Sequence, residues 1–168
     1  MAAQEPLSRL VLAATSVADD LGFVALADLA GIVGSVGARS YRVIGGHMVG
    51  ALVARWQLGA ELYRETGDVD LGVPPIAVRE HALIERLAGL GYTKVAGNRF
   101  SRTIKDVAVV VTGARVPARE AIIDVLIPAY TSRARQNRRV GDQLVTTEVL
   151  GLTTALNRAP VVLTSSTA

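Results

Sequence analysis

The 168-residue sequence contains no cysteine and only two histidines, His47 and His81. The absence of cysteine excludes a disulfide framework, a cysteine-ligated zinc site and a cysteine nucleophile. Two histidines are too few for a histidine-rich zinc centre. No apolar run reaches the roughly 18 residues that a membrane-spanning helix needs, and the short run at 10–14 follows Glu5 rather than a basic cluster. We therefore expect a cytoplasmic protein with no secretory signal and no membrane partner.

Half of the residues are apolar, and the length suits one domain with a core of its own. The net charge of +3 is unevenly distributed, because residues 131–168 hold five basic and two acidic side chains while the rest is balanced. Such a cluster is either a solvated loop or a contact for an RNA backbone, whose phosphates attract arginine. Four of the five basic residues in this segment are Arg133, Arg135, Arg138 and Arg139.

The spacing of apolar residues predicts most of the regular structure. Helices are expected over 7–21, where Gly22 would end the helix, and over 26–33, 76–90 and 150–156. Another helix should follow Gly45-Gly46 and pack Trp56 in the core. Its apolar face would consist of Met48, Val49, Leu52, Val53 and Trp56. Strands are predicted at 41–44, 69–73, 92–95, 100–104, 107–112, 122–127 and 161–163.

This order of elements predicts an α/β (α+β) domain with a mixed β-sheet flanked by helices. Two early strands are separated by a helix, and the later strands should form an antiparallel meander. Residues 1–37 would be a helical prefix, 41–127 the core, and 128–168 a basic C-terminal extension of the same single domain.

Three features could carry chemistry, and the first is Gly45-Gly46 between a predicted strand and a predicted helix. Glycines at this position let backbone amides approach a phosphate, and the helix N-terminus favours negative charge. The alternative is an ordinary tight turn.

The second feature is Asp68-Val69-Asp70, followed by Leu71. Residues i and i+2 of a strand project from the same face, so both carboxylates would point one way while the apolar pair enters the core. Two neighbouring carboxylates repel each other unless a cation lies between them, and Mg²⁺ prefers oxygen ligands. The alternative is a pair of solvated aspartates at a strand edge.

The third feature is Asp124, which is the only charged residue in the stretch 122–127. A lone carboxylate within a buried strand is costly unless it is paired or bound to a metal. The alternative is an aspartate exposed at a sheet edge. A glycine turn, two same-face acids and a third acid on a later strand together suit metal-assisted phosphoryl transfer.

These residues resemble the signature of the DNA polymerase β-like nucleotidyltransferases. The stretch Arg64-Glu65-Thr66-Gly67-Asp68-Val69-Asp70-Leu71 is especially similar to the AbiEii/MenT-type toxins of type IV toxin–antitoxin systems. The resemblance covers about residues 41–127. It implies a mixed-sheet nucleotidyltransferase core that transfers a nucleoside monophosphate from a nucleoside triphosphate to a hydroxyl, with Mg²⁺ or Mn²⁺ as cofactor.

The resemblance also implies roles for individual residues. Asp68, Asp70 and Asp124 would be the catalytic carboxylates and metal ligands, with Asp124 polarising or deprotonating the attacking hydroxyl. The nucleotide would contact the segment that begins at the double glycine and the loop before the first aspartate. The residues concerned are Gly45, Gly46, His47, Arg64 and Thr66.

For the toxin branch, the resemblance implies that the acceptor is the 3′ end of a tRNA and that a cognate antitoxin is a partner. The arginine cluster at 133–139 would then hold the RNA backbone. Two alternatives stay open, a protein-nucleotidylating enzyme of the AMPylation type and a nucleotide-binding regulator without turnover. Asp124 favours an enzyme over the regulator, because a protein that only binds nucleotide has no need of a third carboxylate.

Overall fold

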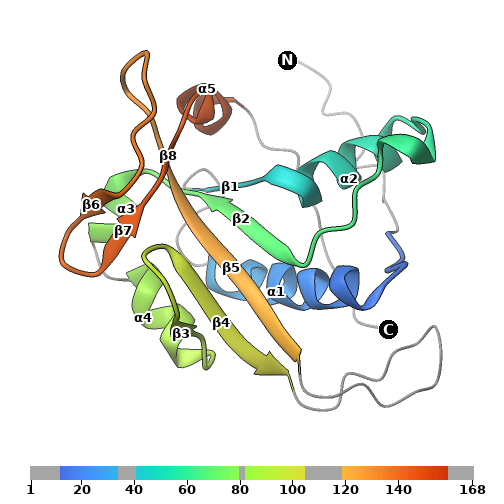
Figure 1. Cartoon of the computed structure of the whole chain (residues 1–168), viewed down its shortest axis with the longest axis horizontal. Helices are drawn as coiled ribbons and strands as arrows, with labels where there is room; N and C mark the ends of the chain where they lie inside the picture. Colours follow the sequence, from blue (N-terminus) through green and yellow to red (C-terminus); the bar gives the residue numbers. More distant parts are fainter. Residues whose placement is uncertain (1–11, 34–40, 80–81, 105–118, 159–168) are drawn as a thin grey trace, which may run out of the picture.

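The computed structural model describes residues 12–33, 41–79, 82–104 and 119–158 (Figure 1). Its main sheet contains the strands β1 (Arg42–Ile44), β2 (Asp68–Gly72), β5 (Arg119–Pro128), β4 (Arg99–Ile104) and β3 (Thr93–Lys94), in this spatial order. Only β2 and β5 run parallel in this row, while each other neighbouring pair is antiparallel. The predicted mixed sheet, with a late antiparallel meander, is therefore confirmed.

Three short strands complete the β structure. The strand β8 (Glu148–Val149) pairs with the end of β5, and β6 (Arg138–Val140) pairs with β7 (Leu144–Thr146) as a separate two-stranded sheet. None of these three strands was predicted, because two or three residues are too few to show an alternating pattern. The segment after residue 128 is thus joined to the main sheet through β8.

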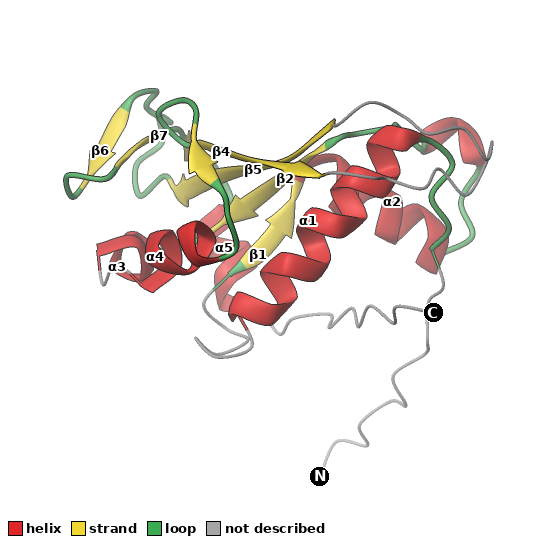
Figure 2. Ribbon diagram, turned by 90° about the horizontal axis from the view of Figure 1, so that it is seen from below, coloured by secondary structure: helices red, strands yellow, loops and turns green. Residues whose placement is uncertain are grey.

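The helix α1 (Val17–Val33) runs along one face of the sheet, beneath β2 and β5 (Figure 2). The others are α2 (Gly45–Arg55), the 3₁₀ turn η1 (Ala60–Leu62), α3 (Pro75–Arg79), α4 (Ala82–Gly89) and α5 (Leu152–Asn157). Among the described residues, no helix is long and apolar enough to cross a membrane. The core lies between α1, α4 and the sheet, and it includes Leu29, Leu71, Leu87, Phe100 and Ile123.

The prediction that a helix ends at Gly22 is wrong, because α1 runs through this glycine to Val33. The His47 ring packs against the helix backbone there, and a Cβ at Gly22 would collide with its Cε1 and Nε2 atoms. Gly22 is thus explained by close packing rather than by helix termination. The helix predicted over 26–33 is the second half of α1, and the part of the first predicted helix before residue 12 lies outside the described residues.

The predicted apolar face of α2 is confirmed only in part, because Val53 is buried while three of its other members are exposed. Met48 and Val49 are exposed, and Trp56 is 59% exposed just beyond the helix end. The buried side of α2 is instead the one that carries His47, Gly50, Ala51 and Val53. A Cβ at Gly50 would lie 2.9 Å from the Tyr63 ring, so any larger residue at this position would require the ring to move.

The remaining predicted elements agree in part with the structure. The helix predicted over 76–90 corresponds to α3 and α4, with residues 80–81 outside the described part. The strands predicted at 107–112 and 161–163 also fall outside it. The other predicted strands and the late helix at 150–156 are confirmed within a few residues.

Candidate functional site

Alternation along β2 places its two carboxylates on the sheet face that is turned away from α1. Val69 and Leu71 have no exposed surface and belong to the core, while Asp68 and Asp70 point to the opposite side and are half-buried. The D-x-D spacing therefore has the geometric consequence that the sequence predicts.

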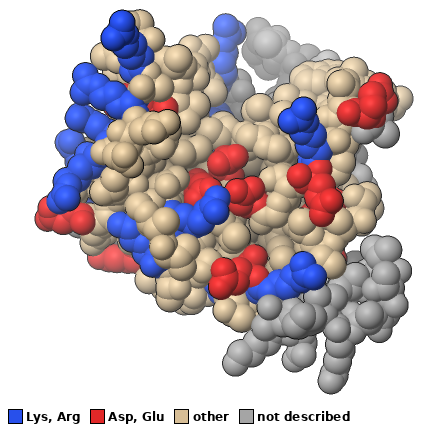
Figure 3. All heavy atoms as spheres, in the orientation of Figure 1, with Lys and Arg blue, Asp and Glu red and all other residues tan. Residues whose placement is uncertain are grey.

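Strand pairing brings Asp124 to the same face. In the parallel pair of β2 and β5, Asp70 is the register partner of Asp124, and in the antiparallel pair of β5 and β4, Asp124 is the partner of Arg99. Ile123 on β5 is fully buried on the core side, so Asp124 faces away from the core. Figure 3 shows acidic side chains gathered near the middle of this face, with basic side chains beside them.

Arg99 connects two of the three acids. Its Nε and Nη2 atoms donate to the Asp124 Oδ1 and Oδ2 atoms at 3.0 and 2.6 Å, which is the two-bond fork that arginine forms with a carboxylate. Nη2 also donates to Asp68 Oδ2 at 3.0 Å. The hydrogen bonds to Asp124 raise the pKa of Arg99, so its positive charge is permanent here.

Thr66 fixes the other oxygen of Asp68. Its hydroxyl donates to Asp68 Oδ1 at 2.9 Å and also lies 3.3 Å from the Asp68 carbonyl oxygen. All four carboxylate oxygens of Asp68 and Asp124 therefore accept at least one hydrogen bond, from Thr66 or from Arg99.

Asp70 differs from the other two acids. No group in the described segments donates a hydrogen bond to its carboxylate. Burial and the negative charges of Asp68 and Asp124 raise the pKa of Asp70 to about 6, against the opposing effect of Arg99. One arginine does not compensate three carboxylates, so the cluster keeps an excess of negative charge.

The double glycine lies directly beside Asp70. Ile44 is the register partner of Asp70, and Gly45 begins α2 with a φ of +66°, in the left-handed region that favours glycine. A Cβ at Gly45 would collide with the Asp70 carboxylate, and a Cβ at Gly46 would lie 2.7 Å from the Thr66 methyl group. Both glycines thus have packing reasons of their own, besides any contact with phosphate.

The N-terminus of α2 has no side-chain cap. Ile44 occupies the N-cap position and makes no side-chain hydrogen bond to the helix amides. Uncapped amides and the helix dipole together favour a negatively charged group at this end. Since α2 begins next to the carboxylates, phosphate and metal positions would be neighbours.

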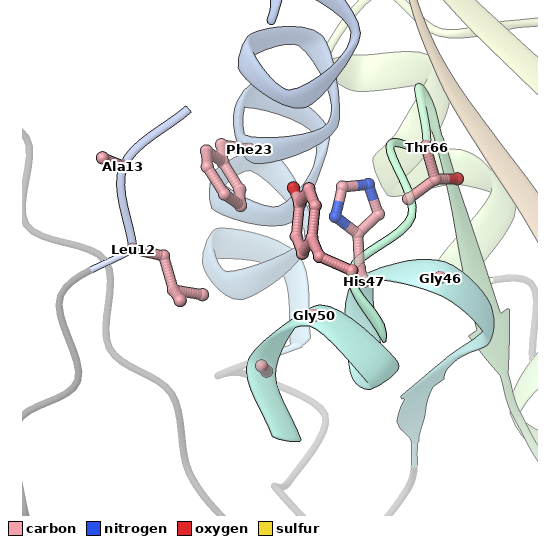
Figure 4. Close-up of a pocket in the computed structure, with 9 residues that line it drawn as sticks. Leu12, Ala13, Phe23, Gly46, His47, Gly50 and Thr66 are labelled. Atoms are coloured by element: carbon pink, nitrogen blue, oxygen red, sulfur yellow. The ribbon is translucent and has the colours of Figure 1, made fainter. Parts of the chain in front are cut away.

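The His47 side chain is buried and packs against Gly22 of α1. Figure 4 shows its ring with Phe23 on one side and Thr66 on the other, and the Phe23 ring centroid lies 6.0 Å away. Burial lowers the pKa of His47 despite the nearby charges of Asp19 and Asp68, and Nε2 has no partner among the described residues. The adjoining cavity of about 30 Å³ has room for little more than a water molecule. His47 is only 7% exposed, so little of its surface is available for a contact with nucleotide.

A larger space lies beside Asp68 itself. An open groove of about 420 Å³ is lined by Asp68, Arg119 and apolar atoms of Ala18, Leu21 and Ile122. It opens to solvent, whereas the enclosed cavity next to His47 is too small for a substrate. The lining of the groove also includes Gly67 and the acid Glu120.

Among the described residues, no hydrogen bond or ion pair joins the remaining predicted contact residues to the carboxylates. Arg64 is exposed and makes no hydrogen bond or ion pair with the described residues. The four arginines of 133–139 are all exposed on and before β6, at the left edge in Figure 3. Arg138 and Arg139 are adjacent on a strand and so point to opposite faces, which means that the four do not share one flat surface.

The acids fit a divalent cation in their chemistry but not in their present arrangement. In the segments that the structure describes, no group of three or more acids and histidines is positioned to hold a metal ion. Three oxygen donors with excess negative charge nevertheless suit Mg²⁺ or Mn²⁺. The obstacle is Arg99, which occupies the oxygens of Asp124 and one oxygen of Asp68.

Sequence reasoning missed Arg99. Its position follows from the antiparallel register of β4 against β5, and the segment 105–118 between these strands leaves that register undetermined by any local motif. The only signal was a basic residue directly before an apolar strand residue, Phe100, which many exposed strand ends share.

Comparison with known proteins found no matching family model, no matching curated protein and no matching solved structure. Function is therefore inferred from the arrangement of the site and from the motif it contains.

Proposed function

We propose that this protein is a metal-dependent nucleotidyltransferase that transfers a nucleoside monophosphate from a nucleoside triphosphate to a hydroxyl group. The observation that carries the proposal is the convergence of Asp68, Asp70 and Asp124 on one sheet face, next to the uncapped N-terminus of α2. Phosphoryl transfer needs carboxylates, a cation and a phosphate-binding site, and little covalent chemistry from the protein.

Each residue of the site would have a separate role. Asp68 and Asp70 would hold Mg²⁺ or Mn²⁺, and the bound cation would neutralise phosphate charge and increase the acidity of the attacking hydroxyl. Backbone amides at Gly45 and Gly46 would bind phosphate oxygens at the start of α2. Asp124 would accept the proton of the acceptor hydroxyl. The hydroxyl oxygen would bond to the α-phosphorus of the nucleotide as pyrophosphate departs.

The acceptor is proposed to be RNA, specifically the 3′ end of a tRNA, with a cognate antitoxin as a further partner. The exposed arginines of 133–139 support an RNA acceptor, because they carry the positive charge excess of the chain. The two-stranded sheet of β6 and β7, called the arm below, also contacts the turn before Arg99, since Val145 N of β7 donates to Gly97 O at 3.1 Å. RNA bound on this arm would therefore lie next to the strand that carries Arg99.

The test is incubation of the purified protein with each labelled nucleoside triphosphate, Mg²⁺ and total RNA or cell lysate. We expect label in an RNA band of tRNA size, loss of labelling with a chelator, and loss of labelling in the double variant D68N/D70N. Label in a protein band would redirect the acceptor to a protein hydroxyl. No label in any polymer with any nucleotide would contradict the proposal.

The RNA contact has a separate test. Replacing Arg135, Arg138 and Arg139 by glutamine should weaken RNA binding and flatten its salt dependence by about one unit of slope for each lost phosphate contact. Nucleoside triphosphate binding should persist, because these side chains lie apart from Gly45. If RNA affinity and its salt dependence do not change, the arginines of 133–139 are solvated and do not contact RNA.

One observation favours a second candidate, a nucleotide-binding regulator without turnover. Arg99 already supplies a positive charge where a transferase needs a metal ion. In a regulator, nucleoside triphosphate would bind at α2 without Mg²⁺. Calorimetry would then show this binding, while the labelling experiment would show no incorporation.

A further inference from the structure

The carboxylate cluster contains a cation of its own, the guanidinium group of Arg99. It satisfies both oxygens of Asp124 and one of Asp68, while Thr66 satisfies the remaining oxygen of Asp68. A divalent cation that binds Asp68 or Asp124 at the oxygens facing Arg99 must therefore replace these hydrogen bonds.

We propose that Arg99 is a counter-cation that exchanges partners, binding Asp68 and Asp124 in the empty site and the phosphate groups of the substrate when a divalent cation occupies it. This inference rests on the proposed function, because it assigns the phosphate of a nucleoside triphosphate as the second partner. Arg99 would thereby oppose the binding of a cation that arrives without nucleotide, and it would bind the phosphate when cation and nucleotide are bound together.

The surroundings of Arg99 allow such an exchange. Its side chain is 41% exposed, whereas that of Asp124 is only 12% exposed, so the arginine is the partner that can swing into solvent. The backbone on either side is held in place, because Val125 N donates to Asn98 O at 2.9 Å and Arg99 pairs with Asp124 in the ladder. Only the side chain has to move.

Arg102 on the same strand shows the contrasting case. It points to the core side, where it pairs with Asp28 of α1 and lies over the Tyr92 ring, with 5.4 Å from its Cζ atom to the ring centroid. This arginine is less exposed and is held by both an acid and an aromatic ring. Arg99 has no aromatic contact among the described residues, and its partners are the acids that a cation would claim.

Charge and shape identify phosphate as the second partner. Once a cation binds the acids, the guanidinium group loses its anions and needs others. Its planar fork forms two parallel bonds with a phosphate group as it does with a carboxylate. Phosphate bound at the N-terminus of α2 would lie close by, because α2 begins at Gly45 beside Asp70.

The first experiment measures Mn²⁺ binding without nucleotide by calorimetry. R99M removes the charge and keeps an unbranched side chain, and R79M removes an exposed positive charge at the end of α3 as the matched control. We expect R99M to bind Mn²⁺ at least about tenfold tighter than the wild type, because a cation at a few ångströms is removed. R79M should leave the affinity unchanged. Equal or weaker binding by R99M would overturn the inference.

The second experiment measures binding of a non-hydrolysable nucleoside triphosphate in saturating Mn²⁺. Here the order should reverse, with R99M binding the analogue at least about tenfold more weakly than the wild type and R99K falling between them. Circular dichroism of both variants checks folding, and R99K, which keeps the charge, tests the inference if R99M does not fold. Analogue affinity that is the same in all three proteins would overturn the phosphate partner.

The two proposals can fail separately. If the wild type binds Mn²⁺, D70N abolishes this binding and R99M binds no tighter, the Arg99 inference fails and the metal site stands. If neither the wild type nor R99M binds Mn²⁺ with or without nucleotide, the metal-dependent function fails and takes the inference with it.

Discussion

The two faces of the main sheet have opposite chemistry although alternate residues of the same strands build them. On the face toward α1, Val69 and Ile123 are completely buried. On the other face, the neighbouring residues Asp68, Asp70 and Asp124 form a negative cluster that one arginine only partly neutralises. The first face is arranged for stability, whereas the second keeps like charges together at a cost in stability.

This difference supports the proposal that the charged face binds a ligand. Burial and the neighbouring negative charges raise the pKa of Asp70 to about 6, which means that ionised Asp70 opposes folding at neutral pH. A fold selected for stability alone would gain from a neutral residue at this position. Substitutions on the two faces should therefore separate activity from stability.

The largest expected effect is on activity, at Asp124. D124N keeps the shape of the side chain and removes its negative charge, so transfer of nucleotide to the acceptor should fall about 10²–10³-fold. The melting temperature should change by only a few degrees, since the amide oxygen can still accept one bond from Arg99. Activity close to that of the wild type would place the chemistry elsewhere.

On the core face, the expected effect is on stability. I123A removes buried methyl groups between β5 and the helices, which should lower the free energy of unfolding by about 2–5 kcal/mol. In a chain of this length the melting temperature should fall by roughly 5–15 °C. Activity per folded molecule, measured well below the melting temperature, should match the wild type. A loss of activity without a loss of stability would contradict the division between the two faces.

A smaller effect, dependent on pH, is expected at Asp70. Because its pKa is about 6 in the folded state and lower in the unfolded chain, the native state binds the proton more tightly, and ionisation weakens folding as pH rises through 6. After allowance for solvent screening, D70N should gain about 1 kcal/mol at pH 7.5, or about 2–4 °C in melting temperature. The gain should vanish near pH 4. A difference that does not change between pH 4 and 7.5 would show that charge is not its cause.

The smallest effect is expected outside both faces, at Trp56. This side chain is 59% exposed, so W56S should change the free energy of unfolding by no more than about 0.5 kcal/mol in chemical denaturation. If the free energy of unfolding fell by several kcal/mol, Trp56 would be a core residue, as the helical spacing of the sequence predicts.

Local patterns predicted the features that depend on a single strand. The alternation in Asp68-Val69-Asp70-Leu71 gave the correct face for both acids, and the apolar run around Asp124 gave a buried strand. Features that depend on which elements meet could not be predicted in this way. Which side of α2 is buried follows from the approach of Tyr63 at Gly50.

Local sequence patterns also could not predict the roles of Gly22 and Arg99, because both depend on contacts between different elements. Glycine commonly ends helices, and only the position of the His47 ring shows why this one lies inside α1. Arg99 reaches the acids through a strand register that no short motif encodes. The acids of the site could be found from sequence, whereas the cation that balances them required the structure.

The most direct test of the charged face as a nucleotide site is a crystal structure with Mn²⁺ and a non-hydrolysable nucleoside triphosphate. We expect an anomalous scattering peak at the carboxylates of Asp68 and Asp70, triphosphate at the start of α2 beside Gly45, and Arg99 turned from Asp124 to a phosphate group. Triphosphate bound elsewhere, with no peak at these carboxylates and Arg99 still paired with Asp124, would contradict this account.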